Sequence, residues 1–125
     1  MKKSIYLFLL LVPLMSFASE KRCGWLDNPS PAHLWLIDKD GSWSLSIQGG
    51  YSVDDESMDN IPWPSENEDE FVRTNNNYGF SCACLDVEVD RGKLVVLKVI
   101  SGEHLLLKRC LEDIDLSKSI PLRFQ

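Results

Sequence analysis

In this 125-residue chain, the side chains best suited to covalent or acid–base chemistry are those of four cysteines and two histidines. Cys82 and Cys84 are separated by one residue, and a disulfide between them would close a small, strained ring. Each is therefore expected to bond to a distant cysteine, and Cys23 and Cys110 are the two that remain. The sequence predicts two disulfides, and it leaves two of the three possible pairings open.

Metal binding is the alternative use of such residues. Structural zinc sites usually pair their ligands in C-x-x-C units, whereas this chain has one C-x-C and two distant single cysteines. Residues 38–41 resemble the start of a calcium-binding loop, but apolar strand residues follow where the loop would need its distal glutamate. We therefore expect neither a metal site nor a cofactor.

The histidines belong to no recognisable catalytic pattern. His33 follows a proline-containing turn and His104 stands at the start of an expected strand, and the spacing joins neither to a serine or an acid. The sequence also lacks a nucleophile elbow, a phosphate-binding loop and an H-E-x-x-H motif. These observations favour a protein that is not an enzyme. A small hydrolase that uses His104 or His33 with a carboxylate of the acidic segment is an alternative.

The first 18 residues have the three parts of a secretory signal peptide. Two lysines precede an apolar run from Ile5 to Met15, and Ser16-Phe17-Ala18 supplies a small-x-small cleavage site. The run is shorter than the roughly 20 residues that a membrane-spanning helix needs. We expect residues 1–18 to be removed and residues 19–125 to be exported, to the periplasm or outside the cell, without membrane insertion after processing. Disulfides are stable in such an oxidising compartment.

Acidic residues are concentrated in one segment. Eight of the nineteen Asp and Glu residues fall between Asp54 and Glu70, a stretch without Lys or Arg. Nucleic acids and anionic membranes are poor partners for such a chain, whereas a basic protein would suit it. We expect a loop over residues 52–70. Loops longer than about 15 residues are usually functional or disordered, and this composition predicts disorder at both ends of the loop.

Trp63 lies between two prolines inside this acidic loop. A rigid, exposed aromatic side chain makes a good anchor for a partner protein. Trp63, Asp69 and Glu70 are therefore the candidate partner-binding residues. The alternative is that Trp63 folds back over the rim of the core, and the large energetic gain from burying an aromatic ring favours it.

The first hairpin is predicted from residues 34–38 and 42–48, which alternate apolar and polar side chains on either side of an Asp-Gly turn. Trp43, Leu45 and Ile47 share one face of the second of these strands. Residues 71–74 are a further candidate strand.

Two other segments carry weaker signals. Residues 27–31 contain two X-Pro steps and are expected to be irregular. Residues 112–115 form either a helical turn or an irregular strap.

The second hairpin contains the cysteine pair. Its strands are residues 78–89 and 94–100, joined by a turn at Asp90-Arg91-Gly92. The apolar alternation shifts by one position near Cys84-Leu85, which indicates either a β-bulge or burial on both faces.

The position of Cys110 bears on the shape of the sheet. In a flat meander with another turn near Gly102, Cys110 would lie several residues away from Cys82 and Cys84. Either Ser101-Gly102 does not form a tight hairpin, or the sheet curls as in a small barrel, and we favour the curl. The sequence thus predicts a mostly β, single-domain fold. It is a small disulfide-stapled antiparallel sheet or partly closed barrel of about five to six strands with a long acidic loop.

Four short motifs in order resemble a family of small exported bacterial proteins that is catalogued only as a domain of unknown function. The motifs are Cys23-Gly24-Trp25-Leu26-Asp27-Asn28-Pro29, Gln48-Gly49-Gly50-Tyr51, Tyr78-Gly79 leading to Cys82-Ala83-Cys84-Leu85, and a closing Cys110. The likeness covers residues 23 to about 113. It implies export, one domain and four paired cysteines, and it assigns no activity.

These observations favour a non-catalytic binding module, such as an inhibitor-like partner of a basic protein, because charge complementarity speeds and steers association. A structural component of the cell envelope is the alternative from a different class. A surface without a pocket or a contiguous apolar patch would favour that alternative.

Overall fold

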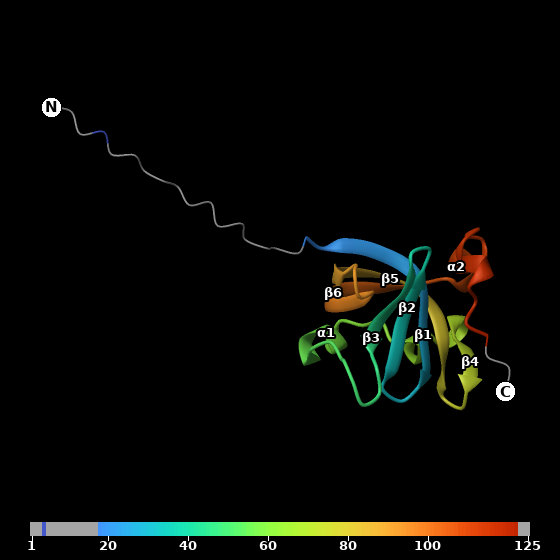
Figure 1. Cartoon of the computed structure of the whole chain (residues 1–125). Coiled ribbons are helices and arrows are strands. Elements are labelled where there is room, and N and C mark those ends of the chain that lie inside the picture. The colour runs from blue at the N-terminus through green and yellow to red at the C-terminus, as the bar shows by residue number, and fades with distance from the viewer. Residues whose placement is uncertain (1–3, 5–17, 123–125) are drawn as a thin grey trace.

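The computed structural model describes residue 4 and residues 18–122 (Figure 1). Nearly all of the predicted signal peptide, residues 1–18, lies outside the described residues, so it stays a prediction. Six strands form one sheet: β1 (Glu20–Ser30), β2 (His33–Asp38), β3 (Gly41–Ser46), β4 (Val72–Asn75), β5 (Tyr78–Asp90) and β6 (Val95–Leu105). Within the described part of the chain, no helix has the length and apolar character needed to cross a membrane.

Five of the strands are arranged as a ring. β2 pairs with β1 and β3, and β5 pairs with β1 and β6, all antiparallel, while the short β4 extends one edge of β5. The ring closes where β3 and β6 run parallel at Ser44 and Val95, with a 3.0 Å hydrogen bond from the Ser44 amide to the Leu94 carbonyl. The predicted partly closed barrel is confirmed, although the sheet is mixed rather than wholly antiparallel. A partly open five-stranded barrel is also the architecture of OB folds, and a shared fold assigns no function by itself.

β5 is the strand with the most neighbours. Gly79 to Leu85 are buried without interruption, and beyond them buried and half-buried residues alternate. The shift in the apolar pattern near Cys84-Leu85 therefore marks burial on both faces. The bulges in the pairing with β6 lie slightly later, between Asp86 and Val87 and between Glu88 and Val89.

β6 runs straight through Ser101-Gly102 to Leu105, so the sheet has no hairpin at Gly102. The glycine is needed for a close approach, because a Cβ at this position would lie 2.5 Å from Cδ of Pro62. Cys110 then follows on the short helix α2 (Leu107–Leu111), which folds back over β5. Cys110 is therefore brought to the cysteine strand by this continuation of β6 as well as by the curl of the sheet.

The expectation that residues 27–31 are irregular is wrong for most of the segment. β1 continues through Pro29 to Ser30, and its pairing with β5 extends to Asn28. A register shift between Asp27 and Ser30 interrupts the pairing with β2. Proline is compatible with a strand at such an interruption, because no ladder hydrogen bond is required from its nitrogen there.

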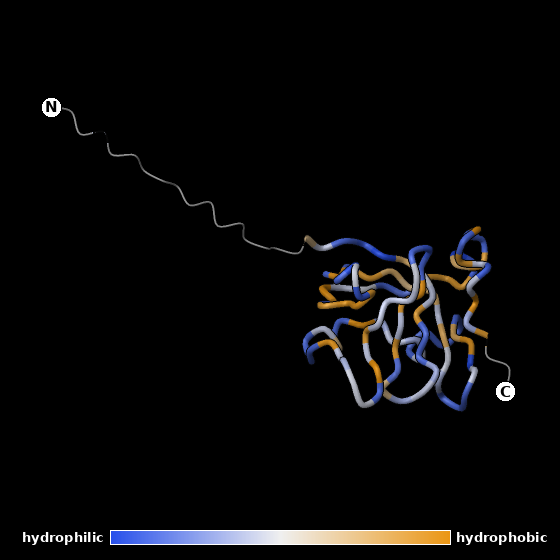
Figure 2. Tube along the Cα trace, viewed as in Figure 1, coloured by the Kyte–Doolittle hydropathy of each residue, from blue (hydrophilic) through white to orange (hydrophobic). Residues whose placement is uncertain are grey.

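The β2–β3 hairpin is confirmed, with Lys39 and Asp40 as its loop and Trp43 and Leu45 buried. Ile47 does not belong to this apolar face, because β3 ends at Ser46 and Ile47 is 39% exposed. The predicted strand near residues 71–74 is β4, and the turn that follows it is the hydrophilic loop at the lower right of Figure 2.

The acidic segment is not disordered at its ends. Ser52 forms a bridge with Ser46, the helix α1 (Asp55–Asp59) follows, and two 3₁₀ helices, η1 (Pro64–Glu66) and η2 (Glu68–Glu70), complete it. The composition suggested disorder because it is dominated by charge. The segment nevertheless buries its few apolar groups, including Val53, Ile61 and Pro64, against the barrel.

Two apolar clusters lie on opposite faces of the curled sheet. The larger fills the inside of the ring, with Leu26, Leu36, Trp43, Leu85 and Val87 among its buried members. The smaller lies on the outer face and consists of Trp25, Phe80, Cys82, Cys110 and Leu116. The segment from α2 to the 3₁₀ helix η3 (Leu116–Lys118) covers it, and residues 112–115 between them form turns and bends.

Candidate functional site

His33 has a serine partner that its spacing did not reveal. Ser30 Oγ lies 2.7 Å from His33 Nδ1 across the β1–β2 turn. The imidazole also stacks on Trp35, with ring centroids 5.3 Å apart and planes at 19°. The sequence did contain a sign of this contact, because residues three positions apart can face each other across a tight turn. His104 is elsewhere, exposed on β6 opposite Ala83.

A pocket of about 300 Å³ joins His33 to Trp63, two residues singled out from the sequence. We call it the His33–Trp63 pocket. Leu34, Ile47, Met58 and Trp63 supply its apolar surface. Its volume lies at the lower end of the range usual for small-molecule sites, and it is large enough for one side chain of a partner.

The polar residues of the pocket are largely occupied with the local backbone. The Asn28 amide donates to the carbonyls of Ser30 and His33, at 3.1 and 2.6 Å. The Ser46 hydroxyl donates to the Ala32 carbonyl at 2.8 Å. Among the described residues that line the pocket, none is acidic. The pocket therefore has no carboxylate among these residues, and it does not bring His33 together with a loop carboxylate as the hydrolase alternative requires.

Trp63 itself is half-buried and packs against the inner core. Its indole nitrogen donates to the Met58 carbonyl at 3.3 Å. The ring thus covers the rim of the core, as the favoured alternative expected, and also forms a wall of the pocket.

Helix α1 positions charge beside this pocket. Asp54 caps the helix by accepting from the Ser57 amide at 2.9 Å, and its hydrogen bonds with Ser57 lower the pKa of the Asp54 carboxyl. Ser57 Oγ accepts a hydrogen bond from the backbone amide of Val99 at 3.0 Å, and the side-chain amide of Asn60 donates one to the Val99 carbonyl at 3.0 Å. These two hydrogen bonds hold α1 against the backbone of β6, at the amide and the carbonyl of one residue.

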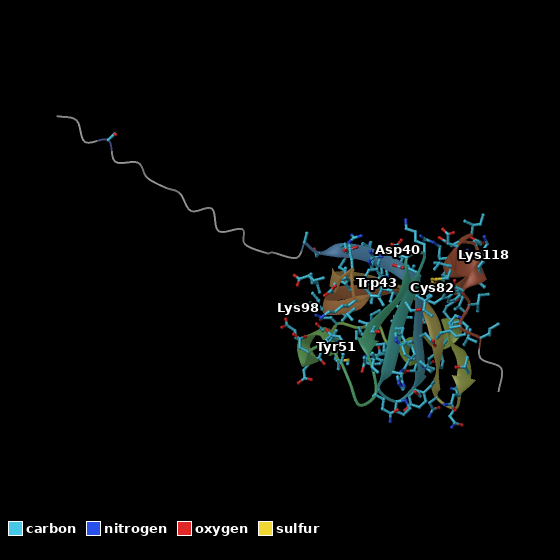
Figure 3. The ribbon with its side chains drawn as sticks, viewed as in Figure 1. Asp40, Trp43, Tyr51, Cys82, Lys98 and Lys118 are labelled. Carbon is cyan, nitrogen blue, oxygen red and sulfur yellow. A yellow bond between two sulfur atoms is a disulfide. The ribbon has the colours of Figure 1, made fainter. Side chains whose placement is uncertain are left out.

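The exposed acids of this region are Asp54, Asp55, Glu56 and Asp59. Tyr51 is close to them, and its hydroxyl donates to the Val96 carbonyl at 2.6 Å. Burial raises the pKa of Tyr51, and the Asp54 charge adds to this shift. Figure 3 shows Tyr51 and Lys98 together on the α1 side of the domain.

The other two candidate partner-binding residues are not part of this pocket. Glu70 Oε2 accepts from the Leu107 amide at 2.7 Å, so this side chain ties the acidic segment to the start of α2. Asp69 is exposed in η2. The structure thus brings Trp63 together with His33 and does not bring it together with Asp69 or Glu70.

The carboxylates of the Asp38–Gly41 turn hold an arginine. Arg22 Nη1 lies 2.7 Å from Asp38 and 2.9 Å from Asp40, and the guanidinium lies 3.9 Å above the centroid of the Trp43 ring. Burial by itself would lower the pKa of Arg22, but the two carboxylates outweigh it and the pKa is raised. The hydrogen bond from Arg22 likewise lowers the pKa of Asp40. This group of charges, in which Arg22 and Asp38 are buried, was not foreseen from the sequence.

The four cysteines form two disulfides, Cys23–Cys84 and Cys82–Cys110. Cys110 lies on α2, and Figure 1 shows α2 on the side of the domain away from α1. Both disulfides line a hollow of about 340 Å³ together with Leu105. We call this hollow the disulfide groove. The pairing that the sequence left open is decided by register, because Cys23 lies directly opposite Cys84 in the β1–β5 ladder.

Comparison with known proteins adds the family. No curated protein and no solved structure matches the chain. Residues 17–117, which include both disulfides and the His33–Trp63 pocket, match one family, described as a protein of unknown function (DUF4087). The chain therefore belongs to the DUF4087 family of proteins of unknown function.

Proposed function

We propose that this protein is an exported, non-catalytic binding module that docks a basic partner protein on its α1 side. The observation that supports this most directly is the mostly apolar His33–Trp63 pocket beside the exposed acids of α1. Two disulfides fit an extracellular location, because such bonds persist in oxidising compartments.

The pocket suits the side chain of an arginine or lysine. Leu34, Met58 and Ile47 offer an apolar wall for the aliphatic stem, and long basic side chains bury their stems while the charge remains near water. The Trp63 ring can face the cationic head, which is attracted to the face of an aromatic ring. The α1 carboxylates then lie where the charge emerges.

The charge of the segment supports the same partner. The segment from Asp54 to Glu70 contains eight acids and no base, so its field attracts cations from solution. Attraction between complementary charges raises association rates, and added salt screens this attraction. The pocket would provide the specificity and the acidic segment the speed of encounter.

Binding to the pocket can be tested with defined peptides. We would record backbone amide NMR spectra of residues 19–125 during titration with N-acetylated, C-amidated Gly-X-Gly peptides, in which X is Arg, Lys, Leu or Glu. The proposal expects the Arg and Lys peptides to shift the signals of Leu34, Met58 and Trp63, and the Glu peptide to shift none. Equal shifts with Glu, or shifts confined to other residues, would contradict it.

Capture of the natural partner tests the same surface. The immobilised domain would be exposed to the exported proteins of the host at low and physiological salt. Two variants weaken the surface: Trp63→Phe, and the triple variant Asp55→Asn, Glu56→Gln and Asp59→Asn. A variant with Glu112→Gln and Asp115→Asn removes two charges on the α2 side, against three in the triple variant, and is the control. The proposal expects a basic protein to be retained by the wild type and the control and lost by the triple variant. If all four forms recover the same proteins, or none, a structural envelope role becomes the better explanation.

A further inference from the structure

The two disulfides differ in their exposure to solvent. Cys23 is exposed, whereas its partner Cys84 is 6% exposed. Cys82 and Cys110 are each 1% exposed and belong to the outer apolar cluster. A dissolved thiol can therefore reach the first disulfide at Cys23, while the second is covered.

The backbone would hold the first pair in place even without its covalent bond. Cys23 and Cys84 are direct partners in the β1–β5 ladder, with Cα atoms 4.0 Å apart. This ladder continues on both sides of them, from Glu20 to Asn28. Cys82–Cys110 has a different task, because it ties α2 to β5 where no strand ladder does so.

The surroundings of Cys23 offer room for a reactant. The disulfide groove adjoins a second hollow of about 250 Å³, and Cys23 lines both. The charged residues that line the two hollows are Lys21, Arg22, Asp38, Lys39, Arg109, Glu112, Asp113 and Asp115. Arg22 and Asp38 are engaged with each other, and Lys21 pairs with Glu103 at 3.5 Å. The remaining charged side chains are two cations, Lys39 and Arg109, and three anions, Glu112, Asp113 and Asp115, so the exposure of Cys23 and not electrostatic attraction favours attack here.

We propose that Cys23–Cys84 is a thiol-exchange site for a dithiol, such as the reduced C-x-x-C pair of an exported oxidoreductase, and that Cys82–Cys110 is a purely structural bond. This inference does not depend on the proposed binding function, because it concerns the opposite side of the domain.

The exchange follows the usual chemistry of thiolates and disulfides. One thiolate of the dithiol attacks Cys23 Sγ, the Cys23–Cys84 bond breaks, and Cys84 leaves as a thiolate. The second thiolate of the dithiol then attacks the first sulfur of the dithiol, which is bonded to Cys23 in the mixed disulfide, and Cys23 leaves as a thiolate. The dithiol loses two electrons and becomes a disulfide, and Cys23 and Cys84 gain them and take up the two protons.

The first test is a reduction series on the folded domain, residues 19–125. The protein would be treated with dithiothreitol for increasing times, alkylated, and mapped by mass spectrometry, while near-ultraviolet circular dichroism monitors folding. We expect alkylation at Cys23 and Cys84 at a rate at least about tenfold higher than at Cys82 and Cys110, with the fold retained. Simultaneous opening of both bonds, or opening of either only as the fold is lost, would overturn the proposal.

The second test identifies the attacked sulfur and is independent of redox equilibrium. Cys84→Ser leaves Cys23 as a single thiol, and Cys23→Ser leaves Cys84 as the matched control. We expect glutathione disulfide to modify Cys23 in the first variant at least about tenfold faster than Cys84 in the second. Similar rates, or a faster reaction at Cys84, would contradict attack at Cys23.

Discussion

The indole nitrogen of Trp25 donates a 2.8 Å hydrogen bond to the carbonyl of Leu116, which lies 91 positions further along the chain. Trp25 is 1% exposed and makes an edge-to-face contact with Phe80, with ring centroids 5.3 Å apart. This bond fastens the C-terminal segment over the outer cluster. It is the non-covalent counterpart of Cys82–Cys110.

Replacing this donor should loosen the C-terminal segment. Trp25→Phe removes one of two hydrogen bonds that the Leu116 carbonyl accepts, since the Ser119 amide also donates to it at 3.0 Å, and losing a typical hydrogen bond costs about 0.5–1.5 kcal/mol of unfolding free energy. Urea denaturation measures the loss, and amide hydrogen exchange should become faster at residues 116–119. Trp63→Phe is the control, because its bond to Met58 is longer and half-buried. An equal loss of unfolding free energy in both variants would show that the hydrogen bond to Leu116 contributes no more than the one to Met58.

Gly24 is required by the close approach of β1 to β2. A Cβ at this position would lie 2.0 Å from the carbonyl oxygen of Ile37, and backbone atoms cannot move aside as a flexible side chain would. We expect Gly24→Ala to cost about 3 kcal/mol or more. At Gly50 the nearest atom would be 3.7 Å away, so Gly50→Ala should change stability by less than about 0.5 kcal/mol. Thermal denaturation of the two variants compares them, and a mild effect at Gly24 would disprove the close contact.

Arg22 should be far more important for stability than the neighbouring Lys21. Arg22→Met leaves the buried carboxylate of Asp38 without its cation, which typically costs about 3–5 kcal/mol. The exposed pair of Lys21 with Glu103 should contribute less than about 1 kcal/mol. Urea denaturation of Arg22→Met and Lys21→Met provides the comparison.

A double-mutant cycle isolates the pair itself. Asp38→Asn keeps an oxygen that can accept from the Trp43 indole, which now donates to Asp38 at 2.9 Å. Arg22→Met combined with Asp38→Asn should therefore be more stable than the sum of the two single losses predicts. Simple additivity would mean that the two charges do not interact.

Asp54 should give a pH-dependent contribution to stability. Its pKa is lowered in the folded protein from an ordinary value of 3.8, because the hydrogen bonds with Ser57 favour the charged form. The contribution is therefore complete above this ordinary value and is lost as the pH falls through the lower, folded pKa. Asp54→Ala should lower the melting temperature at neutral pH, and the difference from the wild type should shrink in acid. Asp59→Ala, in the same helix but not at its cap, is the control, and a difference that persists in acid would contradict the assignment.

Local patterns predicted much of the secondary structure. The Asp-Gly turn located the β2–β3 hairpin because it requires particular backbone angles from its own residues. The alternation in β5 located the cysteine strand, and the unpatterned spacing of the cysteines indicated disulfides rather than zinc. These features depend on residues that are close together in the sequence, so no tertiary information was needed to identify them.

The errors occurred where a distant contact overrides a local preference. A turn near Gly102 was one of the two alternatives left open, but Gly102 lies in a strand, where it pairs with Leu85 of β5 and is closely approached by Pro62. Pro29 was expected to end regular structure, but β5 pairs with β1 as far as Asn28. The acidic segment was expected to be disordered at its ends, but Val99 of β6 binds both Ser57 and Asn60.

The sequence by itself determined the fold class, the two disulfides and the concentration of acidic charge in one segment, because composition and short-range periodicity carry this information. Only the tertiary structure decided which cysteines pair, where Arg22 is buried, and that His33 and Trp63 line one pocket. The physical reason is the closure of the ring. β1 pairs with both β2 and β5, and the register of these two ladders places distant residues side by side. The spacing of those residues along the chain does not reveal that they are in contact.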